Sequence, residues 1–359
     1  MKGVMIMKKI ISLCLCNFLL FFLVGCNENN KEVKADIFNI KIASEVASDY
    51  MQKVTSGEFE EANKITTKSI KDNEDIKGIK KDNINGYKLD RVSEGADHAY
   101  FKYLIVREEK DESRVDLDSL VLKVEKVNDE YLVDEIKSKN EKQIYKVDKT
   151  LRSRDYEIGK SQLLLRMKDL PREVYPSKDN VVINKEGVPQ GSFSKIGIGF
   201  NGNKVAFTTT DNLRTFIGLI VVEDSKATSG SANSSASVEK DIDRAIDDAL
   251  EVPILNKLIP YDVVDGSKVE KLLFSKDDGE LIVQIREEGK GSGIRIYKNP
   301  TGELLKLNLN EYFPVEKYSS DVMRIDDKGV FIKVTALTDD KKNEGTYKID
   351  VEELKVFKE

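Results

Sequence analysis

The sequence predicts two folded regions: an α+β N-terminal domain, with helices on a curved antiparallel sheet, and a mainly antiparallel β domain after it. Apolar residues follow helical spacing between residues 43 and 65 and strand spacing from residue 87 onward. Three segments of the C-terminal half share one strand-turn-strand pattern. With 359 residues, 40% hydrophobic and 34% charged, the composition is that of a globular chain long enough for two domains.

The first 25 residues predict a targeting signal. Lys8 and Lys9 precede an apolar run, Ile10 to Val24, which is shorter than the roughly 20 residues that span a bilayer as a helix. The run ends with the sequence Leu23, Val24, Gly25 and Cys26. Residues 26–35, which are mostly polar, are expected to form a tether. This pattern resembles a bacterial lipoprotein signal peptide with its lipobox. An uncleaved membrane anchor is the alternative.

The lipoprotein resemblance implies a cellular location for the mature chain. Residues 1–25 would be removed and Cys26 acylated, which would hold the protein on the outer face of the cytoplasmic membrane. The lipid bilayer is then its first partner, through the acylated Cys26. Two or more acyl chains give firm anchoring, because each buried methylene contributes about 0.8 kcal/mol.

Composition excludes several kinds of site. Cys14 and Cys16 leave with the signal and Cys26 carries lipid, so no disulfide or zinc-cysteine cluster remains. His98 is the single histidine, which excludes a zinc site built on two or three histidines, and we predict no metal and no cofactor. The formal charge of −6 becomes about −9 once Lys2, Lys8 and Lys9 are removed, which argues against nucleic acid binding.

Residues 36–148 are expected to form the first domain. One apolar helical stripe runs through residues 43, 46, 47, 50, 51 and 54, Gly57 is placed to end it, and Phe59, Ala62 and Ile65 start a second, short helix. Four strands are predicted at 87–92, 98–107, 116–127 and 131–136, separated by polar turns. Strands this close in sequence pair as antiparallel hairpins.

Two segments of this domain, 49–63 and 122–136, resemble the helix-turn-helix and the final hairpin of the NTF2-like superfamily. The cystatin-like fold is the alternative. The resemblance implies a cone-shaped domain, in whose enzymes a carboxylate, often with His or Tyr, points into the cone. The candidates are His98, Asp90, Tyr87 and Tyr103. A catalytic His98 needs a partner carboxylate and a dry pocket. We expect instead a solvated His98, an outward-facing Asp90 and two structural tyrosines, and hence no catalytic residue.

Residues 149–359 are expected to form the β-rich second domain. The repeated hairpins are 196–208, 272–284 and 322–334, with Gly202, Gly279 and Gly329 at the turns because a tight hairpin needs positive φ. Further strands are predicted at 216–223, 293–298, 304–309, 345–349 and 354–357, and a flexible loop at 225–237. The turn Phe274–Gly279 resembles that of TolB-like and WD40-like propeller repeats, which implies a partial propeller-like domain. An irregular antiparallel sandwich is the alternative.

The function that we expect is that of a lipid-anchored, extracytoplasmic and non-catalytic binding or assembly module, with an envelope protein or a peptide as its partner. Two alternatives remain open. One is an enzyme that uses the cone pocket with His98 or Asp90 as base. The other is a solute-binding lipoprotein, although the chain lacks the alternating strand-and-helix pattern of a two-lobed binder.

Overall fold

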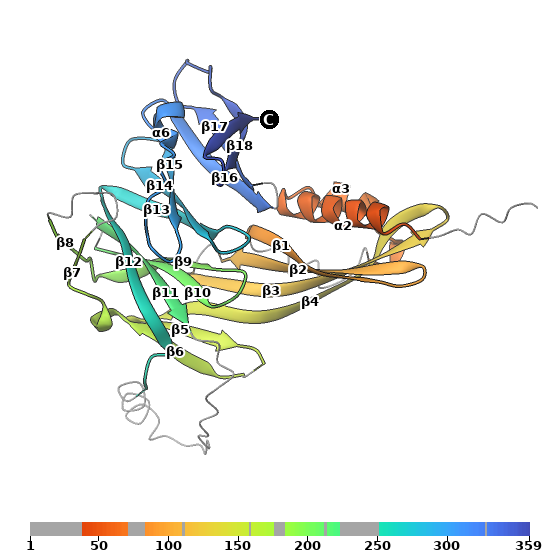
Figure 1. Ribbon diagram of the computed structural model, residues 1–359, viewed down its shortest axis with the longest axis horizontal. Helices are drawn as coiled ribbons and strands as arrows, with labels where there is room; N and C mark the ends of the chain where they lie inside the picture. Colours follow the sequence, from red (N-terminus) through yellow and green to blue (C-terminus); the bar gives the residue numbers. More distant parts are fainter. Residues whose placement is uncertain are drawn as a thin grey trace, which may run out of the picture. The chain divides into compact units, whose positions relative to one another are not determined.

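The computed structural model describes residues 38–70, 83–109, 112–157, 159–175, 184–211, 214–222, 251–326 and 329–359. Within them, antiparallel strands in five sheets dominate (Figure 1), and Asn39 to Glu359 form one compact unit. None of the described helices is long and apolar enough to cross a bilayer. The signal 1–25 with its lipobox, the tether 26–35 and the loop 225–237 lie outside the described residues and stay predictions.

The predicted helix pair is confirmed as α2 (Ile40–Thr55) and α3 (Phe59–Lys64), followed by the 3-10 turn η1 (Lys68–Ile70). Asn39 caps α2 by accepting a hydrogen bond from the Lys41 N–H at 3.0 Å. Gly57, at φ +78°, lies in the turn that ends α2. Five of the six stripe residues are buried, namely Ala43, Ala47, Tyr50, Met51 and Val54, and Val46 is half-buried.

The four predicted strands of the first region belong to a six-stranded antiparallel meander, which we call sheet A. Its strands are β1 (Asn83–Glu94), β2 (His98–Glu108), β3 (Arg114–Val127), β4 (Glu130–Val147), β5 (Thr150–Asp155) and β6 (Ser161–Arg166). Helix α2 contacts β1 to β4, and the buried strand residues Phe101, Leu120 and Leu122 share one face of the sheet. The change from helical to strand spacing of the apolar residues predicts this arrangement, in which helices pack on one face of an antiparallel sheet.

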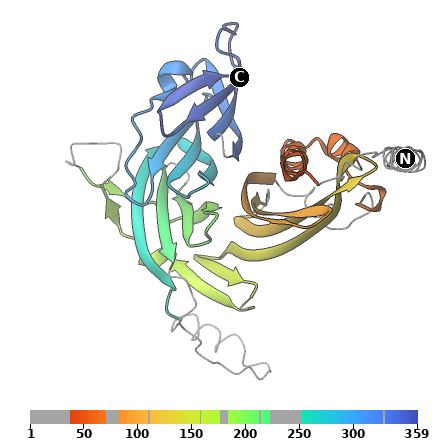
Figure 2. The ribbon, with the colours of Figure 1, turned by 45° about the vertical axis from the view of Figure 1, so that its right-hand side comes forward.

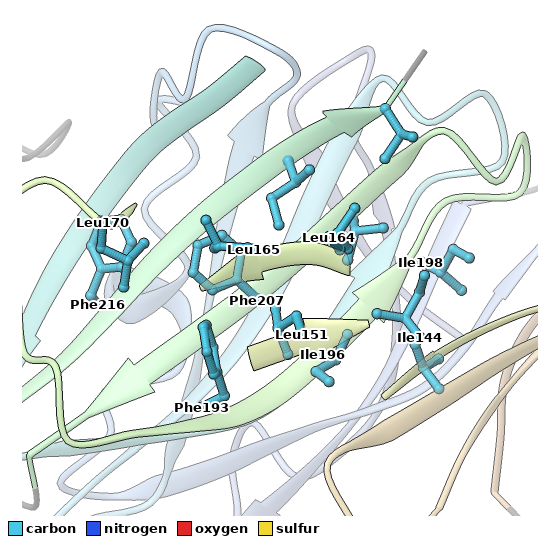
Figure 3. Packing of buried hydrophobic residues seen from close by; sticks show 14 of the residues in the cluster. Ile144, Leu151, Leu164, Leu165, Leu170, Phe193, Ile196, Ile198, Phe207 and Phe216 are labelled. Carbon is cyan, nitrogen blue, oxygen red and sulfur yellow. The ribbon is translucent and has the colours of Figure 1, made fainter. Parts of the chain in front are cut away.

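Sheet A continues past residue 148, where the sequence places the end of the first domain. That boundary falls in the turn between β4 and β5, which pair with each other. The far ends of the long strands β3 and β4 contribute Val115, Leu117 and Ile144 to a second core. This core also contains Phe207 and other residues of the C-terminal half (Figure 3), so one apolar cluster takes side chains from both predicted regions.

Polar contacts also join sheet A to the C-terminal half. The Lys142 ammonium donates to the Gly202 carbonyl at 2.9 Å, and Lys195 forms an ion pair with the nearly buried Glu108. Glu251 accepts from the Leu163 N–H of β6 at 2.8 Å and pairs with the Arg152 guanidinium at 3.0 Å. The Lys142 and Lys195 contacts cross the predicted boundary at residue 148, whereas the Glu251 contacts join β5 and β6 of sheet A to a residue further along the second region.

The three predicted hairpins are confirmed, each in its own sheet. Sheet C contains β9 (Ser192–Ile198), β10 (Lys204–Thr210), β11 (Arg214–Val222) and β12 (Leu255–Asp265). Sheet D contains β13 (Ser267–Phe274), β14 (Glu280–Glu287) and β15 (Ser292–Lys298). Sheet E contains β16 (Tyr318–Asp326), β17 (Gly329–Ala336), β18 (Gly345–Asp350) and β19 (Lys355–Lys358). A small sheet pairs β7 (Glu173–Val174) with β8 (Glu186–Gly187), after the 3-10 turn η2 (Met167–Asp169).

Neighbouring sheets meet at edge strands. β9 contacts β13, and a Cβ added to Gly197 of β9 would lie 2.5 Å from the Leu272 carbonyl oxygen of β13. β16 contacts β15 of sheet D and β1 of sheet A. Figure 2 shows the three sheets following one another along the chain, from green through cyan to blue. The C-terminal half is therefore mainly antiparallel β structure made of small consecutive sheets.

Two local predictions are wrong. Gly202 and Gly329 have positive φ as expected, but in the middle hairpin Asp278 has φ +58° in place of Gly279. Its buried carboxylate holds it there, because it accepts two backbone N–H groups of the neighbouring sheet. The strand expected at 304–309 consists of one bridge, Tyr297 to Leu304, after which the chain bends into α6 (Leu309–Tyr312).

Candidate functional site

His98 does not lie in a dry pocket. It begins β2, its side chain is 29% exposed, and its Nδ1 lies 2.7 Å from Oδ1 of the exposed Asp97. The hydrogen bond to the imidazole lowers the pKa of the Asp97 carboxyl. The ring packs against Gly95 and edge-on to Tyr100, 5.1 Å away. The imidazole therefore closes the β1–β2 turn, where solvent reaches both it and its carboxylate partner.

Asp90 lies elsewhere on the sheet. It occupies a bulge in β1 between Leu89 and Arg91, and its carboxylate pairs with the Lys102 ammonium at 3.3 Å. Lys102 is four residues beyond His98 on β2, about 13 Å at 3.3 Å per residue. Within the described chain no hydrogen bond or ion pair joins Asp90 to His98, so the two candidates do not form one acid–base pair.

Tyr87 and Tyr103 are part of the packing of sheet A. Their side chains are buried, at 6% and 3% exposure, and their rings meet edge to face with centroids 6.0 Å apart. The Lys276 ammonium of the middle hairpin lies 5.7 Å from the Tyr87 ring centroid. Tyr87 thus links sheet A to sheet D, which is a structural role.

Sequence reasoning missed two buried carboxylates on β3. Asp116 accepts from the Arg114 guanidinium at 2.7 Å and from the Gln143 amide at 2.8 Å. Asp118, 1% exposed, pairs with Arg107, and its second oxygen has no hydrogen-bond partner in the described chain. Burial raises the pKa of the Asp118 carboxyl even though the guanidinium opposes it. The signal was present in the alternation Val115-Asp-Leu-Asp118 inside an otherwise apolar strand.

Asp262 is a buried carboxylate between sheets C and D. Its side chain is completely buried in β12, and Oδ2 accepts from the Arg295 guanidinium and the Tyr297 hydroxyl of β15, each at 2.9 Å. The neighbouring Tyr261 hydroxyl donates to the Asn299 amide oxygen at 2.6 Å. Burial raises the pKa of the Tyr297 hydroxyl, so it stays a donor at neutral pH.

Asp278 makes the second connection between these two sheets. Its carboxylate accepts from the Phe200 and Asn201 N–H groups at 2.8 and 3.0 Å, and the Lys204 ammonium donates to its carbonyl at 2.7 Å. Burial raises the pKa of this carboxyl. A Cβ added to Gly199 would lie 2.8 Å from the carboxylate, so glycine is needed for this close approach.

Glu270 organises the boundary between sheets D and E. Its carboxylate accepts from Gln284, Arg286 and Ser292 at 2.8, 2.6 and 2.7 Å. The Gln284 amide oxygen in turn accepts the Val322 N–H of β16 at 2.9 Å. Partial burial raises the pKa of Glu270, but the three donors and the guanidinium charge outweigh it and hold the pKa below its usual value.

The depressed pKa of Glu270 predicts a pH dependence of stability. The stabilisation from this carboxylate is complete above about pH 4.3, the ordinary pKa of Glu, and is lost as pH falls through the lower folded-state pKa. The free energy of unfolding should therefore fall less steeply below pH 4.3 in Glu270→Gln than in the unmodified protein. Urea titrations from pH 3 to pH 7 measure this difference, and parallel curves for the two proteins would contradict it.

A cavity beside β15 is the best candidate for a binding site. Its volume is about 590 Å³, within the 300–1,000 Å³ range typical of small-molecule sites. Its floor is apolar, formed by Ile294, Ile296, Leu305, Leu307, Leu309 and Phe313, and its rim carries charges of both signs. Two further hollows, of about 480 and 720 Å³, are lined by fewer apolar side chains. Among the described residues no cluster of His, Cys, Asp and Glu could hold a metal ion.

Comparison with known proteins assigns no family. No family model matches the chain, and no curated protein matches it. Among solved structures it has low similarity to β-propeller proteins. One is a prolyl endopeptidase, with 8% identity and a TM-score of 0.32, covering 74% of this chain and 34% of that one. Another is Hsv2 of Kluyveromyces lactis, with 12% identity and a TM-score of 0.26, covering 75% and 71%.

These similarities leave the function open. The chain spans about a third of the length of the prolyl endopeptidase that it matches, and the TM-scores are too low to transfer an activity. What the protein does must therefore be inferred from its own residues.

Proposed function

We propose that this protein is a lipid-anchored, extracytoplasmic lipoprotein that acts as a non-catalytic binding or assembly module for an envelope protein or a peptide. The observation that carries the proposal is the Leu23-Val24-Gly25-Cys26 pattern, which directly follows a short apolar run and two lysines. Firm anchoring by acyl chains would keep the folded part near membrane and wall partners.

The positions of the ionisable side chains support a non-catalytic role. Asp262, Asp278 and Glu270 each accept hydrogen bonds from a neighbouring strand or sheet, which is a structural use of a buried carboxylate. His98 and Asp90, the candidates for a base, have separate partners near solvent. On this proposal sheet A with its helices is an NTF2-like unit, and sheets C, D and E are a partial propeller-like array.

Replacement of Cys26 by serine tests the anchor. Serine cannot be acylated through sulfur, so Cys26→Ser should prevent lipid attachment and signal removal, and the protein should have an apparent mass higher by the uncleaved signal. The fold should be unchanged, because Cys26 precedes the compact unit that begins at Asn39. Membrane fractionation with immunoblotting measures the effect.

Cys16→Ser is the matched control, since it changes a cysteine inside the signal and should leave anchoring intact. A Cys26→Ser protein that stays in the membrane fraction with the mass of the unmodified protein would disprove the lipoprotein proposal.

A further inference from the structure

Sheet D is one strand shorter than its neighbours. Sheets C and E have four strands, whereas sheet D has three and a single bridge on the outer edge of β15. At this bridge Lys298 N–H donates to the Glu303 carbonyl and Leu305 N–H to the Ile296 carbonyl, each at 2.8 Å. After Leu305 the chain leaves the edge toward α6. Residues 303–305 therefore occupy only the beginning of a fourth-strand position.

The unpaired part of this edge directs the N–H and C=O of one residue into the cavity. In an antiparallel strand the hydrogen-bonding groups of alternate residues point to the same side. Since Ile296 and Lys298 bond outward, Ile294 also directs its N–H and C=O away from β14 and into the cavity that it lines. No described segment pairs with those groups. Ile294 is only 8% exposed, and an unpaired buried peptide group costs roughly 1–3 kcal/mol.

The surroundings of Ile294 define what could pair with it. Leu307, Leu309 and Phe313 provide an apolar wall, so the cavity suits an apolar side chain. Lys290, one of the rim cations, is already paired with Glu287 at 2.7 Å and Glu316 at 3.1 Å. The site therefore offers one backbone donor, one backbone acceptor and an apolar hollow, with no excess of either charge. A peptide bond next to an apolar residue matches all three.

We propose that an extended peptide segment of a partner protein binds in this cavity as a short fourth strand of sheet D, antiparallel to β15. The edge is bounded by Ser292, whose N–H donates to Ser319 Oγ at 3.1 Å, and by Ile296. This leaves room for about three residues at 3.3 Å per residue, so the partner presents a loop or a chain end. The inference rests on the proposed role as a binding module and names its partner class.

Selection of peptides and two variants of one residue test the proposal. A random heptapeptide phage library is selected on the detergent-solubilised full-length protein, and enriched peptides are titrated by fluorescence anisotropy. Ile294→Pro removes the N–H that points into the cavity and keeps the β14–β15 bonds, which residues 293, 295 and 297 make. It should raise the Kd about tenfold, because the loss of one good hydrogen bond weakens binding by about that factor. Ile294→Val keeps the donor and should bind within about twofold of the unmodified protein.

A backbone scan of the peptide is independent of how well Ile294→Pro folds. N-methylation of successive peptide residues should weaken binding at the one residue whose N–H faces the Ile294 carbonyl and be tolerated at its two neighbours, because only alternate N–H groups face β15. Enriched peptides that bind Ile294→Pro unchanged, or that tolerate N-methylation everywhere, would overturn the proposal. So would a concentration-dependent dimer that Ile294→Pro dissociates, which would make a second copy the occupant. None of these results would alter the membrane fractionation of Cys26→Ser, so the two proposals fail separately.

Discussion

Asp262→Ala is expected to lower the free energy of unfolding by about 3 kcal/mol. The substitution leaves the buried Tyr297 hydroxyl without its acceptor and the Arg295 guanidinium, whose side chain is 34% exposed, without its counter-ion. Removing one partner of a buried ion pair is costly because the remaining charge is neither paired nor fully solvated. The partial exposure of Arg295 keeps the loss at the lower end of the range for such pairs.

Guanidinium chloride unfolding, followed by circular dichroism, measures this loss. Asp265→Ala is the matched control, because Asp265 ends the same strand and is exposed, so its replacement should change stability by less than about 0.5 kcal/mol. Equal effects of the two substitutions would show that the Asp262 contacts contribute little net stability. Asp262→Asn should be intermediate, since an amide oxygen can still accept from Tyr297.

Phe207→Ala is expected to destabilise the protein by about 3–5 kcal/mol, the usual cost of removing a buried ring. Phe207 is completely buried in β10, and its ring meets Phe193 and Phe216 edge to face at 5.9 Å each. The cluster of Figure 3 also contains Ile144 of sheet A, so the cavity left by the ring should weaken the far ends of β3 and β4 as well.

Hydrogen exchange with mass spectrometry separates a shared core from two independent ones. In Phe207→Ala, peptides that cover residues 115–117 and 142–146 should exchange faster, in step with peptides from β10. Phe357→Ala removes a ring that is 44% exposed and should leave all of them unchanged. Faster exchange in sheet C alone would mean that the two halves of the chain unfold independently.

Sequence periodicity was sufficient for elements whose signal is local. The stripe from Ala43 to Val54 and the three hairpins needed only the 3.6- and 2-residue repeats and polar turns. β12, which contains Pro260, was not predicted. Proline is tolerated there because β12 is the edge strand of sheet C, with a bulge at Tyr261 beside Pro260. Edge position depends on the order of the strands in space, which a single sequence does not reveal.

The roles of the carboxylates could not be predicted for a related reason. Asp262 and Asp265 are both acidic residues of one strand, yet only Asp262 faces Arg295 of the next sheet. Asp278 has the sequence context of an ordinary turn residue, and its burial depends on how closely two hairpin turns approach. Such roles depend on how one sheet is aligned with the next. Local sequence patterns indicate only which residues of a strand share a face.

The continuity of sheet A has a consequence for dividing this protein into fragments. A piece that ends at residue 148 would leave the last six residues of β4, 142–147, without the β5 strand that pairs with them. It would also turn Leu117 and Ile144 from core residues into surface ones. Unpaired edges beside exposed apolar side chains are templates for edge-to-edge aggregation. The two halves are therefore poor units for domain exchange.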